Sequence, residues 1–185
     1  MATESLERAV ASTKALLAKV NADNLGRSTP CASWDVRGLV NHIVGGMQFF
    51  NAAASGEKPP EGDADVADTD FVGAFSDVAK QVVAKLGEPG ALEATYDLGF
   101  AQLPGSAFLG LASLDTFQHG WDLASALGES TDLDADLAAQ LLAQAQASIP
   151  DTFRGPEGAP FGPRVEVAET APAADQLAGF LGRQV

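Results

Sequence analysis

The fold is decided by residues 106–127, Ser-Ala-Phe-Leu-Gly-Leu-Ala-Ser-Leu-Asp-Thr-Phe-Gln-His-Gly-Trp-Asp-Leu-Ala-Ser-Ala-Leu, a stretch of helical length that is apolar on nearly every side. Pro104 and Gly105 precede it, and Gly128 is placed to end it as a C-terminal cap. A helix that is apolar all round is normally the most buried helix of its bundle. The sequence therefore predicts one central helix that other helices surround.

Four further segments carry the apolar spacing of amphipathic helices, with three- and four-residue steps. They are Glu4 to Val20, Ser33 to about Ala54, Phe71 to Leu86 and Leu133 to Ile149. Ser33 is the expected N-cap of the second segment, with Asp35 in its first turn, because both residue types suit the positive end of a helix. Gly45 and Gly46 inside that segment suggest the close approach of another backbone.

The rest of the chain is predicted to be mostly irregular. Residues 56–69 contain five acidic residues with prolines and glycines, which is typical of a solvated linker. Leu92 to Leu98 favours a short strand or hairpin, and after Asp151 we expect a loop, an extended Val165–Val167 and a short helix at Ala173–Leu181. The predicted fold class is all-α. A helical bundle spans residues 1–150, and a short irregular C-terminal appendage, residues 151–185, packs on it.

Composition excludes several classes of function. The 185 residues include 11 Lys and Arg against 25 Asp and Glu, a net charge of −14, which disfavours nucleic-acid binding and an anionic membrane surface. One cysteine excludes an internal disulfide framework and a multi-cysteine zinc site. The first twenty residues spread charges along their length, unlike a signal peptide or a membrane span. We expect a soluble, cytoplasmic protein.

Both histidines fall in the segments predicted to be most buried. Asp115 and His119 are four residues apart, and Asp122 follows three residues later, so the three side chains share one helix face. His42 lies on the edge of the core face of the second segment. If the two helices pack side by side, His42, Asp115 and His119 converge into a set suited to zinc or another divalent transition metal. Three protein ligands leave a coordination position open, which favours a reactive metal over a structural one.

Purely structural interpretations of these residues also stay open. Each histidine is also compatible with a hydrogen-bonded position in the core. The Asp115–His119 spacing is also compatible with a local side-chain pair on one helix. Asp122 either accepts a hydrogen bond that orients a ligand histidine, or pairs with a backbone group or Arg37. Cys31 is either a fourth ligand or redox thiol, or a buried and inert cysteine, the interpretation that we favour.

Three arginines have both a functional and a structural interpretation, whereas the two tryptophans have a structural one. The arginines, Arg154, Arg164 and Arg183, are positioned to steer an anionic small molecule, but we expect each to be solvated. Trp34 and Trp121 are expected to be packing residues at helix junctions.

Three parts of the sequence resemble one known family. Thr29-Pro-Cys-Ala-Ser-Trp-Asp-Val-Arg-Gly-Leu-Val-Asn-His42 looks like the helix-entry motif of the DinB-like superfamily. Asp115-Thr-Phe-Gln-His-Gly-Trp-Asp-Leu-Ala124 resembles the second motif of its mycothiol-dependent maleylpyruvate isomerase-like branch. The stretches Phe161-Gly-Pro-Arg-Val165 and Leu177-Ala-Gly-Phe-Leu-Gly-Arg183 resemble the end of short, uncharacterised actinobacterial-type members of that branch.

The resemblance implies a DinB-like four-helix bundle with a metal centre. One histidine of the second helix and an acid-x-x-x-histidine pair of a later helix hold a divalent metal, and they correspond here to His42, Asp115 and His119. The isomerase has a glutamate in place of Asp115 and a sizeable C-terminal domain in place of residues 151–185. These departures argue against maleylpyruvate as the substrate and affect metal binding less.

Three functions are compatible with this sequence. The first is a metal-dependent transferase or isomerase, with zinc as the expected metal and nickel as the alternative, in which a low-molecular-weight thiol such as mycothiol reacts with a small electrophile. The second is a non-catalytic module that binds a metal or a small ligand. The third is a bundle whose polar residues form only core hydrogen bonds and which acts through a protein partner. If an oligomer forms, we expect a homodimer.

Overall fold

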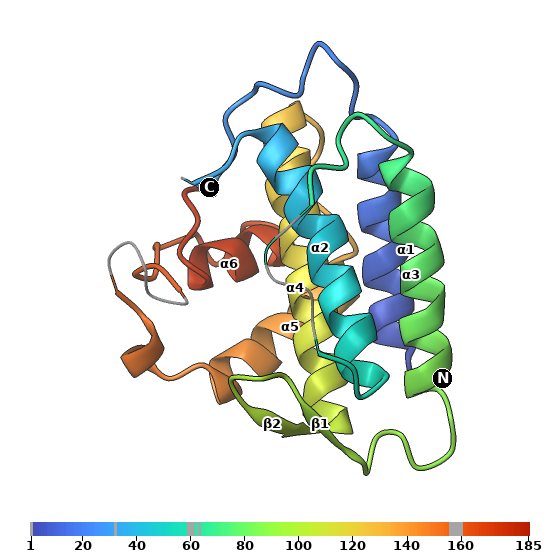
Figure 1. Ribbon diagram of the computed structural model, residues 1–185. Helices are drawn as coiled ribbons and strands as arrows, with labels where there is room; N and C mark the ends of the chain where they lie inside the picture. The colour runs from blue at the N-terminus through green and yellow to red at the C-terminus, as the bar shows by residue number, and fades with distance from the viewer. Residues whose placement is uncertain (1, 32, 59–61, 63, 156–160) are drawn as a thin grey trace.

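The predicted central helix, α4 (Gly105–Leu127), runs through the middle of the molecule (Figure 1). The computed structural model describes residues 2–31, 33–58, 62, 64–155 and 161–185. The other helices are α1 (Glu4–Leu17), α2 (Val36–Ala54), α3 (Phe71–Leu86), α5 (Ala135–Ser148) and α6 (Ala173–Phe180), with a 3-10 turn at Asp151–Phe153. Two short strands, β1 (Thr95–Asp97) and β2 (Gln102–Pro104), precede α4. The prediction of an all-α bundle with a hairpin and an irregular appendage is confirmed.

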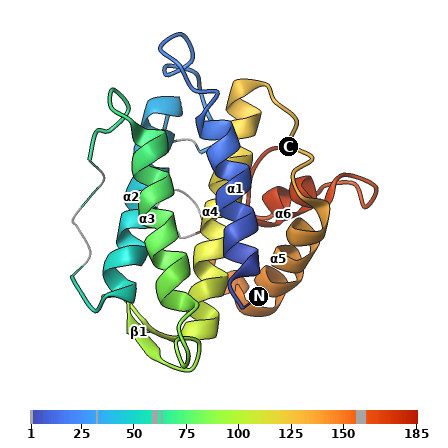
Figure 2. The same ribbon diagram turned by 90° about the vertical axis from the view of Figure 1, so that its right-hand side faces the viewer.

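Helices α1, α2, α3 and α4 form the bundle, and a crossover connection joins α2 to α3. Helices α1 and α4 run in one direction, while α2 and α3 run in the other (Figures 1 and 2). Helix α1 packs most extensively on α4, where Thr13 Oγ1 donates to the Thr116 carbonyl oxygen at 2.8 Å. A Cβ atom on Gly120 would collide with the Thr13 side chain, so glycine is required for this approach. None of the described helices combines the length and hydrophobicity that a bilayer crossing requires.

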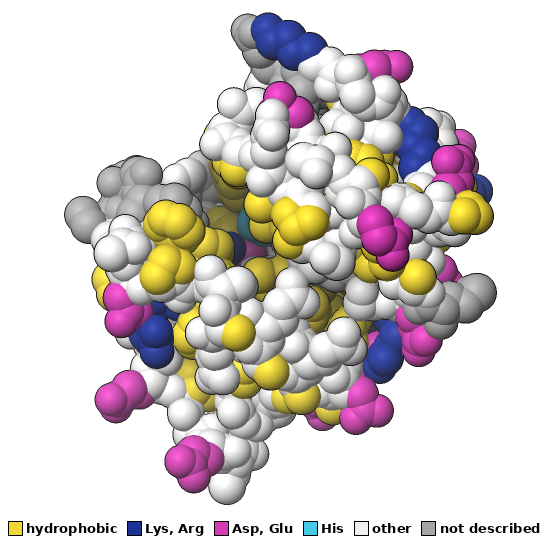
Figure 3. Space-filling view, turned by 90° about the horizontal axis from the view of Figure 1, so that it is seen from below, with side chains coloured by type: hydrophobic (Ala, Val, Ile, Leu, Met, Phe, Trp, Pro, Cys, Tyr) yellow, Lys and Arg dark blue, Asp and Glu magenta, His cyan; other side chains and the backbone are white. Residues whose placement is uncertain are grey.

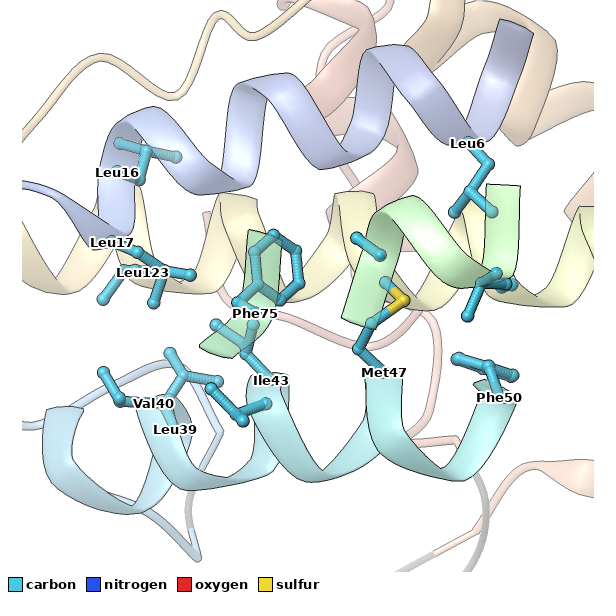
Figure 4. Packing of buried hydrophobic residues seen from close by; sticks show 14 of the residues in the cluster. Leu6, Leu16, Leu17, Leu39, Val40, Ile43, Met47, Phe50, Phe75 and Leu123 are labelled. Atoms are coloured by element: carbon cyan, nitrogen blue, oxygen red, sulfur yellow. The ribbon is translucent and has the colours of Figure 1, made fainter. Parts of the chain in front are cut away.

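Two hydrophobic cores lie on opposite sides of α4. The first fills the space between the four helices, and Figure 4 shows the side chains of α1, α2, α3 and α4 pointing toward one another there. The second joins α4 to α5 and α6, with Trp121, Phe117, Leu141 and Leu177 among its buried members. Trp121 is a packing residue as predicted, and its Nε1 donates to Asp175 at 2.8 Å. Because both sides of α4 are covered, its apolar composition is explained.

The predicted strand belongs to a hairpin. Strands β1 and β2 pair antiparallel, with Tyr96 opposite Leu103. The turn between them uses Gly99, whose φ of 82° lies in the left-handed region that favours glycine. Tyr96 stacks on Phe108 of α4 with ring centroids 4.9 Å apart, which fastens the hairpin to the bundle.

Helix α2 begins two residues later than expected. Asp35, not Ser33, is the N-cap, because its side chain accepts a hydrogen bond from the Gly38 N–H at 2.9 Å. An antiparallel bridge between Ser28 and Asp35 holds Asp35 in the extended conformation that an N-cap needs. Ser33 is exposed in the turn before it.

This correction can be tested by substitution. We expect Asp35→Ala to lower the free energy of unfolding by about 1 kcal/mol, because an N–H group of the first turn loses its acceptor. Ser33→Ala is the matched control, and it should change the free energy by less than about 0.5 kcal/mol. Urea unfolding followed by circular dichroism measures both, and a larger loss for Ser33→Ala would contradict the assignment.

Candidate metal centre

The structure brings the two histidines together across the α2–α4 interface. The rings of His42 and His119 are nearly perpendicular, with centroids 4.8 Å apart. Trp34, which precedes α2, stacks on His42 with centroids 4.2 Å apart and an angle of 26° between the rings. Trp34 therefore packs as predicted, and its contact also orients a candidate ligand.

Asp115 lies one helical turn before His119, and the two side chains meet as the spacing predicted. His119 Nε2 is 3.6 Å from Asp115 Oδ1. On the α2 side, a Cβ built on Gly46 would lie 3.4 Å from Asp115 Oδ2, so Gly46 leaves room for this carboxylate. The expected approach of another backbone at Gly46 is thus the approach of a side chain.

The donor set fits a divalent metal. One ligand atom from each of His42, Asp115 and His119 lies within 4.8 Å of the others. Ligand atoms on one tetrahedral zinc are about 3.4 Å apart, given metal–ligand bonds of about 2.0–2.2 Å. The 3.6 Å between His119 and Asp115 is already close to that value. Two imidazoles and a carboxylate are a common ligand set for zinc, which leaves a further position for a small molecule.

Asp122 determines which nitrogen of His119 faces the candidate metal position. His119 Nδ1 is 3.0 Å from Asp122 Oδ2, and the carboxylate has no exposed surface. A carboxylate accepts only, so Nδ1 carries the proton and Nε2, the nitrogen beside Asp115, keeps its lone pair in the neutral ring. This pattern, in which a carboxylate fixes the tautomer of a ligand histidine, is common at metal sites. Of the interpretations given for Asp122, its contacts favour orientation of His119.

A buried arginine completes the environment of Asp122. Arg183, from the segment after α6, donates through Nε to Oδ1 and through Nη2 to Oδ2, both at 3.1 Å. Gln118 also donates to Oδ1, at 3.3 Å. Cys31 Sγ lies 3.0 Å from Oδ2 and 3.4 Å from Arg183 Nη2. Cys31, His119 and Asp122 are themselves close enough to hold a metal, but the ion pair with Arg183 already occupies Asp122.

These contacts shift the protonation of the central residues. Burial disfavours the charged form of His119, but Asp115 and the hydrogen bond to Asp122 outweigh it and raise the pKa of His119 to about 10. Burial alone would raise the pKa of Asp122, but His119 and Arg183 hold it well below its usual range. The position of His119 between two carboxylates therefore favours a cation.

Two predictions about arginines were wrong, and the structure does not show the alternative in which Arg37 pairs with Asp122. Arg37 does not reach Asp122, because it faces the connection before α3 and forms ion pairs with Asp65 and Asp68. Arg183 is largely buried against Asp122 instead of solvated.

Arg154 was the second wrong prediction, because only 7% of its side chain is exposed. It donates to the Phe180 carbonyl oxygen at 2.6 Å and lies over the Phe180 ring. Arg164 is half-exposed, as predicted.

Two cavities open beside the candidate metal position. One, of about 300 Å³, is lined by Gln118, His119, Arg183 and other residues of the bundle and tail. The other, of about 320 Å³, is lined mainly by Gly45, Gly46, Phe49, Phe50 and Phe100. His42, Leu111 and Asp115 line both cavities. Figure 3 shows a hollow in the surface with a histidine side chain at its bottom and hydrophobic side chains around it.

A larger cavity, of about 630 Å³, is lined by residues 53–58 of the α2 end and by hairpin residues. It contains neither histidine. The candidate chemistry therefore lies in the two smaller cavities.

Comparison with known proteins identifies the family of the chain. Residues 6–124 match the family described as the mycothiol maleylpyruvate isomerase N-terminal domain. The chain belongs to this family. The match includes His42, Asp115, His119 and Asp122, but it ends before the segment that supplies Arg183. The predicted family relationship is confirmed.

Whole-length relatives also exist. Two proteins of Mycobacterium tuberculosis, one from each of two strains and both described as uncharacterized, are 43% identical to the chain over 181 residues. The alignment covers 97% of this chain and 96% of each relative. No solved structure matches the chain. The similarity to these relatives therefore extends far beyond residue 124, where the family match ends.

Sequence reasoning missed several residues of the site. Arg183 was expected to be solvated, and its pairing with Asp122 carried no local signal, because the two residues are 61 positions apart along the chain. Gln118 gave no signal in the sequence, because apolar residues surround it in a segment that is predicted to be buried. Phe100 was hidden in the turn of a hairpin that the sequence indicated only weakly. The Gly45–Gly46 pair was the one signal available, since it marked the face of α2 that the cavity follows.

The ion pair between Arg183 and Asp122 should matter for stability. We expect Arg183→Met to lower the free energy of unfolding by about 3 kcal/mol, because the buried Asp122 loses its arginine. Arg164→Met, at a half-exposed arginine, is the control and should cost less than about 1 kcal/mol. Adding Asp122→Asn to Arg183→Met should recover part of the loss in urea unfolding. Equal losses for the two single variants would show that the buried pair is unimportant.

Proposed function

We propose that this protein binds one divalent metal through His42, Asp115 and His119 and uses it to transfer a small thiol to an electrophile or to isomerise one. Zinc is the expected metal and nickel the alternative. The observation that carries this proposal is the anchoring of His119, because Asp122 holds its Nδ1 proton and leaves Nε2 beside Asp115 and His42.

The surrounding residues would support such a centre in different ways. Asp122 and Arg183 fix the His119 ring, and Trp34 fixes the His42 ring by stacking. When bound, the metal would act as a Lewis acid and would lower the pKa of a thiol that coordinates it. Asp115, with 33% of its side chain exposed, lies where the two cavities meet, so a ligand from either side can reach it.

A thiol is the favoured cosubstrate on two grounds. The chain belongs to a family described by mycothiol, a low-molecular-weight thiol, and the three-residue donor set leaves a position for a further ligand. A free thiol has a pKa near about 8.5, so only a few per cent is thiolate at neutral pH. A site that stabilises the thiolate would therefore increase the reactive fraction by about tenfold or more.

Metal content tests the ligand set. We expect about one zinc per chain in protein purified without chelator, because two imidazoles and a carboxylate suit this metal. His42→Ala should lose most of it, whereas Cys31→Ala should keep it. Elemental analysis by mass spectrometry, before and after zinc or nickel is added, provides the measurement. Loss of metal in Cys31→Ala but not in His42→Ala would place the metal at Cys31, His119 and Asp122 instead.

Turnover tests the chemistry. Mycothiol and 1-chloro-2,4-dinitrobenzene react to give the thioether, chloride and a proton, a change that is followed by absorbance. We expect metal-loaded protein to react at least about tenfold faster than chelated protein or His119→Ala, because both of these lack the centre that generates the thiolate. Cys31→Ala should retain the activity. Metal binding without any thiol-dependent turnover would favour the non-catalytic binding module.

A further inference from the structure

We propose that the two cavities bind different substrates: the apolar cavity holds the planar, apolar part of the electrophile, and the polar cavity holds the thiol cosubstrate. This inference rests on the proposed function and assigns substrate classes to the same site. The apolar cavity is lined by Phe49, Phe50 and Phe100, and the polar cavity by Gln118, His119 and Arg183.

Two consecutive positions of α2 that line the apolar cavity carry no side chain. Gly45 and Gly46 line it where other helix residues would fill the space, and Phe49 follows one turn after Gly45. Among the described residues that line this cavity, His42 and Asp115 are the only titratable ones, and both belong to the metal centre. Away from the centre, the described walls therefore favour an uncharged, apolar group.

Phe100 makes this cavity suited to a planar ring. It is 74% exposed at the hairpin tip, an unusual place for a large apolar side chain. Its ring is nearly parallel to that of Phe49, at 14°, with centroids 6.2 Å apart. Two hydrogen bonds hold the turn that carries Phe100. Asp97 Oδ1 accepts from the Gly99 N–H at 2.8 Å, and the Leu98 N–H donates to the Ala101 carbonyl oxygen at 2.9 Å. Phe49 and Phe100 thus present aromatic faces to the same cavity.

The size of the cavity limits the occupant to a small molecule. A volume of about 320 Å³ lies at the lower end of the range for small-molecule sites, which begins at about 300 Å³. A single substituted ring fits this volume better than a peptide segment. Because His42 and Asp115 also line the cavity, a ring bound there would lie close to two of the proposed metal ligands.

The polar cavity offers hydrogen-bonding groups instead. Gln118 lines it, and its Oε1 is buried without a hydrogen-bond partner among the described residues. Exchanging the amide oxygen and nitrogen would not help, because the oxygen would then face Asp122, which accepts from Nε2. A cavity wall that includes an amide with an unpaired acceptor and the guanidinium of Arg183 favours a polar ligand with hydrogen-bonding groups. A low-molecular-weight thiol with hydroxyl and amide groups has this chemistry.

Binding of an unreactive ring tests the apolar cavity independently of the metal. The probe is 1,3-dinitrobenzene, which lacks a leaving group, titrated into chelated protein by isothermal calorimetry. We expect Phe49→Ala and Phe100→Ser each to weaken binding by about three- to tenfold, because each removes one aromatic face. Phe153→Ser is the control, since Phe153 is also exposed, at 51%, but lines neither cavity. Equal affinities in all variants would overturn the assignment.

Steady-state kinetics with metal-loaded protein tests the division between the cavities. Phe100→Ser should raise KM for 1-chloro-2,4-dinitrobenzene and leave KM for mycothiol unchanged, whereas Gln118→Leu should do the reverse. Parallel changes in both KM values would overturn the division. If the ring binds and depends on Phe49 and Phe100 but no thiol-dependent turnover occurs, the apolar cavity is supported and the proposed function fails. If turnover occurs but neither phenylalanine affects it, the proposed function stands and this inference fails.

Discussion

The contact between Asp122 and His119 is the interaction on which the candidate site depends. Asp122 is fully buried, and a buried carboxylate is costly unless its oxygens are paired. Here both oxygens are paired, with His119 and Arg183 as the main partners. This single side chain thereby connects the bundle to the C-terminal segment and sets the direction of an imidazole. Stability and the geometry of the site are consequently parts of one polar network.

The two sides of α4 have different roles. One side packs on α1, α2 and α3, while the other packs on α5 and α6, so the helix is held rigidly along most of its length. Polar residues occur where α4 faces the start of α2 and the C-terminal tail, and there they meet His42 and Arg183. A rigid helix with a few polar side chains at one seam is a suitable support for a metal centre, because ligand positions vary little.

The sequence predicted those elements of the fold that depend on interactions between residues close together along the chain. Helix α3 was predicted to the residue, since its apolar spacing and the Gly87–Pro89 stop are both local. His42, Asp115 and His119 were chosen from helical spacing and from the burial expected of two helices. The pairing of Arg183 with Asp122 was missed because an ion pair across 61 residues leaves no periodic signal. The N-cap of α2 was misplaced because Ser33 and Asp35 are both good caps, and the bridge to Ser28 decides between them.

The position of Arg183 has a consequence for how the molecule assembles. Domains begin to fold during synthesis from the N-terminal side, and contacts between distant residues form late. The α1–α4 bundle is complete by Leu127, but the cation that pairs with Asp122 is added 61 residues after that carboxylate. Until then, Asp122 has to remain hydrated or pair with His119 alone. A ribosome-bound chain therefore has the candidate metal ligands without the Arg183 ion pair, and docking of the tail supplies this pair.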